Sequence, residues 1–146
     1  DKGMAWVPTF GPVHFQWQDA ECAGWDQTAS DHLRRILDSH LEHVALAHRM
    51  GVKLVAGSDA GSPGVDHGQG LIGEILHFVA AGVPLADALL AATSRPRALW
   101  RMPSANIMPG RTAELAIYDR SPFDDVAALR RARRIIRGDS AIEIGL

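Results

Sequence analysis

The chain has 146 residues and a mass of 15.8 kDa, which suits one ordinary domain or a piece of a larger one. Hydrophobic residues make up 47% and charged residues 22% of the chain, so an intrinsically disordered tail is excluded. The net charge of −2 argues against a general nucleic-acid binder, no apolar run predicts a membrane-spanning helix, and the single Cys22 excludes an internal disulfide or a cysteine-cluster zinc site. We therefore expect neither nucleic acid nor a membrane among the partners.

The first half of the chain predicts a strand, a long loop, a helix and a second strand. Residues 3–10 carry Val, Trp and Phe and favour a buried strand. No leader precedes this strand, so the expected location is the cytoplasm. Residues 11–30 have no period and are expected to form a loop. A helix then runs to about residue 50, capped by Ser30 or Asp31, and residues 52–56 form a short strand.

The second half begins with a glycine-rich loop over residues 57–70. Helices are predicted over residues 71–81, 84–92 and 94–100, and after Pro109-Gly110 the period of two predicts strands over 114–119, 134–137 and 141–144. A strand, a helix and a second apolar strand imply a parallel pair. Because two parallel strands cannot cover both faces of a sheet, we expect further strands from outside this chain.

Asp59 stands out because it follows the second strand and is flanked by small residues. In α/β proteins the carboxyl end of a parallel strand faces the ligand crevice. A carboxylate in that place can bind a divalent cation or act as a general base. The alternative is an aspartate that caps the next helix or closes an Asx turn, and the residues alone leave both open.

Short motifs on both sides of Asp59 stand in a fixed order over most of residues 51–137. They are Gly51-Val52, Gly57-Ser58-Asp59-Ala60-Gly61, Gly64, His67-Gly68, Gly73-Glu74-Ile75, Ala81-Gly82-Val83-Pro84, Ala88-Leu89, Ala91-Ala92-Thr93, Ala98-Leu99, Pro109-Gly110-Arg111, residues 114–119 and Ser121-Pro122-Phe123. Each is weak alone, but their order and gaps together resemble the amidohydrolase superfamily of metal-dependent hydrolases. The prolidase-like and imidazolonepropionase-like members are the most similar.

The resemblance implies an α/β fold that is the C-terminal part of a (β/α)8 barrel with a share of a small β-sandwich. Residues 3–10 would be barrel strand seven and 52–58 strand eight, so that 1–108 form a partial barrel and 109–146 the sandwich portion. Asp59 would match the aspartate of strand eight, which touches the metal and takes a proton from the attacking water. The family's His-x-His pair occurs nowhere in these residues, so this chain supplies one metal ligand of a larger set.

Two histidines are candidates for contact with the substrate. By the resemblance, His67 lies in the loop over the site, and His14 lies in the loop after the first strand on the same side. A histidine on a surface loop is the alternative for His67. Glu74, one turn into the next helix, could pair with a loop group, although a carboxylate on the helix surface is the simpler expectation.

Other patterns point to less specific roles. His40 and His43 are one helical turn apart and could hold a metal, but a solvated helix face is the favoured interpretation. The arginines of residues 130–137 are expected at a solvated sheet edge. The glycines of residues 57–70 fit neither the dinucleotide fingerprint nor the P-loop, so a nucleotide-binding protein is a minor alternative.

The sequence thus predicts a metal-dependent hydrolase acting on an amide or cyclic amide C–N bond of a small substrate. The expected cofactor is one or two divalent ions, zinc first, with Asp59 as ligand and catalytic group. Self-association into a homo-oligomer, or association with the missing part of the barrel, is expected because a partial barrel exposes apolar side chains. The alternative is a non-catalytic fragment or structural remnant that needs a missing N-terminal half.

Overall fold

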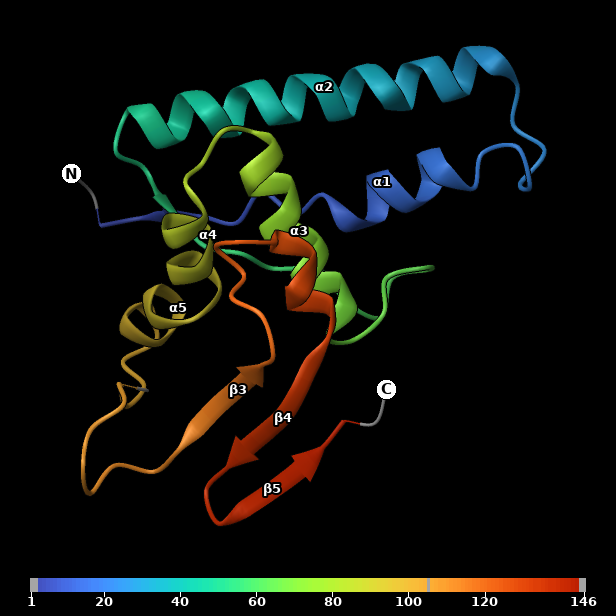
Figure 1. The fold of residues 1–146 in the computed structure, drawn as a ribbon. Helices are drawn as coiled ribbons and strands as arrows, with labels where there is room; N and C mark the ends of the chain where they lie inside the picture. Colours follow the sequence, from blue (N-terminus) through green and yellow to red (C-terminus); the bar gives the residue numbers. More distant parts are fainter. Residues whose placement is uncertain (1–2, 105, 145–146) are drawn as a thin grey trace. The chain divides into compact units, whose positions relative to one another are not determined.

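The computed structural model describes residues 3–104 and 106–144 (Figure 1). The chain divides into two compact units, Asp1–Ala92 and Thr93–Leu146. Within the described residues, every helix is too short or too polar to cross a bilayer.

The first unit contains the predicted parallel pair. Strands β1 (Ala5–Trp6) and β2 (Lys53–Leu54) lie side by side, with Ala5 opposite Lys53. Both strands are shorter than expected. Past Trp6, Pro8 has no N–H to donate and Thr9 turns the backbone to a φ of 48°, so β1 cannot continue.

The expected loop over residues 11–30 is wrong in its first part, because helix α1 spans Gly11–Gln18. No residue of α1 is fully buried, so the segment lacks the apolar stripe that periodicity detects. The following long helix α2 (Gln27–Arg49) also begins earlier than expected. Its N-cap is Asp26, whose carboxylate accepts a hydrogen bond of 2.8 Å from the Ala29 N–H.

The core of the first unit lies among α1, α2, the two strands and helix α3 (Gln69–Ala80), with helix α4 (Leu85–Ala92) packed against α3. Its most buried apolar side chains are Phe10, Val44, Leu54, Val55 and Phe78. The prediction of α3 and α4 is confirmed to within two residues at each end.

The second unit contains helix α5 (Ser94–Leu99), the short 3-10 helix η1 (Val126–Arg130) and an antiparallel sheet. The sheet order is β3 (Glu114–Tyr118), β4 (Ala132–Arg137) and β5 (Ser140–Glu143), which confirms the three predicted strands. Arg97 of α5 donates to the carbonyl of Pro103 and forms an ion pair with Glu114 of β3, so α5 belongs with the sheet. The predicted division into a partial barrel over residues 1–108 and a sandwich portion over residues 109–146 stays a prediction.

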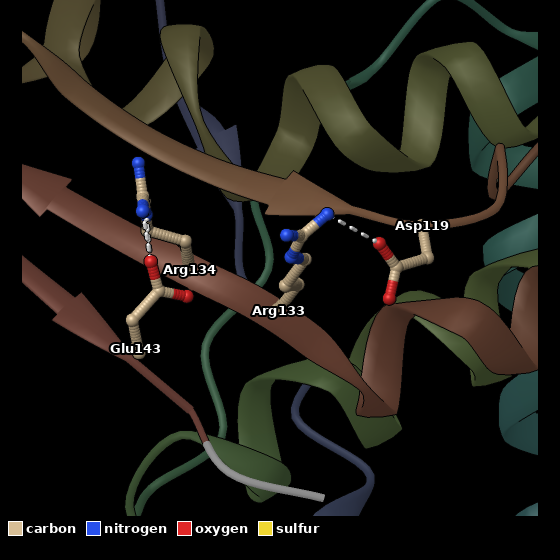
Figure 2. Close-up of polar contacts among 4 residues, drawn as sticks. All are labelled: Asp119, Arg133, Arg134 and Glu143. Carbon is tan, nitrogen blue, oxygen red and sulfur yellow. Dashed lines mark hydrogen bonds and ion pairs between the residues drawn. The ribbon is translucent and has the colours of Figure 1, made fainter.

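The arginine-rich segment runs along β4, and its arginines are exposed. Figure 2 shows two of them paired with carboxylates: Arg133 with Asp119, at 3.2 Å, and Arg134 with Glu143 on β5. The solvated surface expected here is confirmed. The expected place at a sheet edge is wrong, because β4 is the middle strand of the three.

Candidate functional site

The candidate site lies where the chain leaves the carboxyl ends of β1 and β2. Thr9 follows β1 and Asp59 follows β2, and both have left-handed backbone with φ of 48° and 53°. For a residue other than glycine this conformation costs about 1–2 kcal/mol. Such strain persists only where the surroundings impose it, and it gathers at functional sites.

Asp59 presents its carboxylate to solvent at the start of the loop that leads to α3. The Ser62 hydroxyl donates a hydrogen bond of 2.8 Å to Oδ2, and the Ser62 N–H donates one of 3.1 Å to the Asp59 carbonyl. The Gly61 N–H donates to the Val65 carbonyl at 3.2 Å, which closes the loop on itself. The turn therefore fixes one carboxylate oxygen and leaves Oδ1 without a hydrogen-bond partner among the described residues.

The two strand-end segments pack closely on one another. A β-carbon added to Gly11 would lie 3.0 Å from the Ser58 carbonyl oxygen, and one added to Gly57 would lie 2.7 Å from Cγ1 of Val7. A β-carbon at position 64 would lie 1.9 Å from the ring of Phe15. Because only glycine fits at these contacts, the segment after β1 and the loop that carries Asp59 form one continuous wall.

The two candidate histidines lie in different surroundings. His67 is exposed in the turn before α3, and no contact joins it to Asp59 among the described residues. His14 is half-buried on α1, with its ring 4.6 Å from the ring of His77 on α3 and 5.8 Å from that of Trp17. Burial lowers the pKa of His14 below its usual value, which favours the neutral imidazole. It lines a small pocket of about 140 Å³ together with Phe10 and His77.

Glu74 follows the less favoured of its two expectations, because its carboxylate pairs with the backbone of the segment between β1 and α1. The expected surface carboxylate is wrong, because the side chain is 1% exposed and lies under the start of α1. The Phe10 N–H donates to both carboxylate oxygens at 2.9 Å, and the Gly11 N–H donates to Oε1 at 2.7 Å. Burial raises the pKa of Glu74 to about 6, and the hydrogen bonds from Phe10 and Gly11 oppose that rise. The available signal was a carboxylate on the apolar face that Leu71 and Phe78 define.

The histidines of α2 do not share the solvated face expected for them. His43 is exposed, and its Nδ1 lies 2.7 Å from the Ser39 carbonyl oxygen. His40 points inward and stacks on Phe10 at 4.2 Å, so the expectation of a solvated residue is wrong for this position. The aromatic ring of Phe10 provides an apolar surface on which the imidazole of His40 can stack. The pKa of His40 is lowered by burial and, to a smaller extent, by His43.

The residues that the structure describes offer Asp59 as a candidate ligand for a divalent metal. A carboxylate oxygen such as Oδ1 of Asp59 suits a hard or borderline divalent cation. Over residues 3–104 and 106–144, however, no three His, Cys, Asp or Glu side chains gather closely enough to hold an ion. The chemistry of the Asp59 carboxylate suits one ligand of such an ion, and its role as a ligand stays a prediction.

Comparison with solved structures shows what fold these elements belong to. The chain matches a Xaa-Pro dipeptidase, solved with methionine bound in its active site, at a TM-score of 0.78 and 22% identity. The match covers 97% of this chain and 35% of that one. The chain shares its fold with part of a dipeptidase. It also matches an uncharacterized protein at a TM-score of 0.75 and 18% identity, over 98% of this chain and 36% of the other.

The chain thus spans about a third of the length of each of these two proteins. By sequence it matches no protein-family model and no curated protein. The shared fold is mixed α/β with a small antiparallel sheet, which confirms the expected α/β class, while the (β/α)8 barrel and the β-sandwich stay predictions.

Proposed function

We propose that this chain is part of a metal-dependent hydrolase of the amidohydrolase type, which cleaves an amide or cyclic amide C–N bond in a small substrate. The observation that carries the proposal is Asp59, an exposed carboxylate on left-handed backbone at the carboxyl end of a parallel strand. The solved structure that shares this fold over 35% of its length is named a Xaa-Pro dipeptidase, and the bond that joins the two residues of a dipeptide is an amide C–N bond. A dipeptide with proline in second place is therefore the first substrate to test.

Asp59 has two roles in this proposal. Oδ1 is a ligand of a divalent ion, with zinc the first to test, and the same carboxylate accepts a proton from the attacking water and passes it to the leaving nitrogen. When bound there, a divalent ion would supply Lewis-acid chemistry, and Asp59 would be one of the residues that hold it. The Ser62 hydroxyl holds Oδ2, which fixes the orientation in which Oδ1 faces the site.

His67 and His14 are proposed to contact the substrate from the two walls of the site. His67 is exposed on the loop that carries Asp59. The lowered pKa of His14 favours the neutral imidazole, and its ring contacts hold it, so it offers a fixed nitrogen rather than a charge. Neither histidine is proposed as a metal ligand.

The remaining metal ligands are proposed to come from further strands of a (β/α)8 barrel. The described part of the first sheet has two strands, and apolar Met4, Val7 and Val52 around it are exposed. Parallel sheets are covered on both faces in folded proteins. Further barrel strands, or a second copy of the chain, would cover these side chains.

The second candidate function is a structural remnant without catalysis. The observation behind this candidate is that no three His, Cys, Asp or Glu side chains among residues 3–104 and 106–144 gather to hold an ion. The intact mass and metal content of the native polypeptide distinguish the two. A polypeptide well above 15.8 kDa that binds a divalent ion and hydrolyses Xaa-Pro dipeptides supports the hydrolase. A polypeptide of 15.8 kDa without metal or hydrolysis supports the remnant.

A further inference from the structure

We propose that Glu74 is a positioning residue of the candidate site: from α3, its carboxylate fixes the start of α1 against the loop that carries Asp59. The part of this inference that concerns turnover rests on the proposed function. The part that concerns the loops stands on contacts alone.

The carboxylate of Glu74 replaces the cap that α1 lacks. The N-cap residue Phe10 offers no side-chain hydrogen bond, and Pro12 near the first turn has no N–H. The first N–H groups of a helix have no partner inside the helix and carry its partial positive charge. The Glu74 carboxylate accepts hydrogen bonds from the N–H groups of Phe10 and Gly11 and places a negative charge at the N-terminus of α1. A cap that is normally local is here supplied by a residue far along the chain.

The peptide that Glu74 holds touches the segment next to Asp59. Gly11 lies so close to the Ser58 carbonyl and to Val65 that a β-carbon would sit 3.0 Å and 3.2 Å from them. Ser58 immediately precedes Asp59, and Val65 closes the Asp59 loop through its hydrogen bond with Gly61. A shift of the Glu74 carboxylate would therefore move Gly11 and, through its contacts with Ser58 and Val65, the backbone on both sides of Asp59.

Stability alone does not account for a carboxylate at this place. Removing a carboxylate from water is expensive, and the raised pKa of Glu74 shows that its three hydrogen bonds offset that cost only in part. A buried charge that is held by hydrogen bonds can favour one backbone conformation over the alternatives. The strained backbone at Thr9, the residue before Phe10, needs such a constraint to persist.

The test is amide hydrogen exchange in the native protein that carries this chain, at pH 7.5, comparing wild type with Glu74→Gln. Glu42→Gln on the exposed face of α2 is the matched control, because it removes one carboxylate without touching either loop. We expect the Phe10 and Gly11 amides to exchange roughly tenfold faster in Glu74→Gln, as loss of a charge-assisted hydrogen bond implies. The Ser62 and Val65 amides should also exchange faster, while those of α2 are unchanged.

Two outcomes would overturn the positioning role. A change confined to α1 would make Glu74 a helix cap only, and uniform acceleration over the first unit would make it a general stabiliser. If Glu74→Gln does not fold, Glu74→Asp keeps the charge but withdraws it by one methylene, and the same comparison of Ser62 and Val65 decides the question.

Turnover gives a second measurement that keeps the two proposals apart. If wild type hydrolyses a Xaa-Pro dipeptide, Glu74→Gln should lower kcat roughly tenfold or more with unchanged metal content, and Glu42→Gln should match wild type. Unchanged kcat and KM in Glu74→Gln would contradict the positioning role. If wild type hydrolyses nothing, the proposed function fails, and the exchange data still decide whether Glu74 positions the loop.

Discussion

Gly64→Ala tests the close packing of the two walls of the site. Gly64 has a φ of 74°, so any alanine there meets left-handed strain of about 1–2 kcal/mol. Its new β-carbon would also lie 1.9 Å from the Phe15 ring, which forces the ring to move. Overpacking of this kind costs about 1–3 kcal/mol. We therefore expect Gly64→Ala to lower the free energy of unfolding by about 2–5 kcal/mol.

Gly51→Ala is the matched control, because Gly51 has the same φ of 74° and nothing within 4 Å of its added β-carbon. It should show the strain alone, about 1–2 kcal/mol. Urea unfolding followed by tryptophan fluorescence measures both variants. In a Phe15→Ala background, Gly64→Ala should cost no more than Gly51→Ala does. Equal destabilisation by Gly64→Ala and Gly51→Ala in the wild-type background would refute the packing of Gly64 against Phe15.

Three further predictions concern a cap, pH and a surface ion pair. Asp26→Ala removes the N-cap of α2 and should lower the free energy of unfolding by about 1 kcal/mol in urea titrations; no change would mean that the cap is not formed in solution. Burial lowers the pKa of His14 and His40, so the unfolded chain binds protons at these histidines more readily than the folded one. Their contribution to the free energy of unfolding is therefore present above pH 6.5 and is lost as the pH falls below it. The raised pKa of Glu74 has the opposite effect, because the folded chain binds a proton at Glu74 more tightly than the unfolded chain does. The contribution of Glu74 to the free energy of unfolding therefore falls by about 2 kcal/mol as the pH rises from 4.5 to 6. Glu74→Gln should therefore lose more stability than wild type between pH 7 and 4.5 in thermal melts, and parallel curves would contradict the shift. Arg134→Ala should change the free energy of unfolding by less than about 1 kcal/mol, because its ion pair is exposed, and a larger loss in urea titrations would show that the pair is coupled to the sheet.

The regular elements were predictable because their signals are local. The apolar stripe of α2, the period of two in β3 and the glycines that end helices all lie within a few residues of the element they define. Ends were less predictable, and α2 begins at Gln27 because the cap is Asp26 rather than Ser30 or Asp31. Caps of similar chemistry that stand a few residues apart cannot be ranked without the tertiary contacts.

Helix α1 and the burial of Glu74 share one reason for being missed. The helix buries no residue fully and has no side-chain cap of its own, so Pro12 in its first turn is the main local indication of a helix. Its N-terminus is satisfied by Glu74, which is 63 and 64 residues away from its two partners. A hydrogen bond at that separation leaves no mark on local sequence. The one available sign was a charged residue on the apolar face of α3.

The place of Asp59 could be predicted, but its detailed geometry could not. The small residues around it and the strand before it indicated a carboxylate just after a strand; the structure has Asp59 exposed in the loop that follows β2, and its role stays a prediction. The left-handed backbone and the hydrogen bond from Ser62 depend on how the loop closes through Val65. The left-handed backbone at Thr9 could not be predicted from the sequence either, because threonine rarely adopts that conformation.

Asp59→Asn in the native, metal-loaded protein tests the central proposal most directly. Asp66→Asn in the same loop is the control, because it makes the same chemical change at an exposed carboxylate away from the strand end. We predict that Asp59→Asn keeps the circular dichroism spectrum, binds the divalent ion less tightly, and lowers hydrolysis of a Xaa-Pro dipeptide by roughly a hundredfold or more, while Asp66→Asn matches wild type. Hydrolysis at the wild-type rate by Asp59→Asn would contradict the assignment of this carboxylate to the reaction.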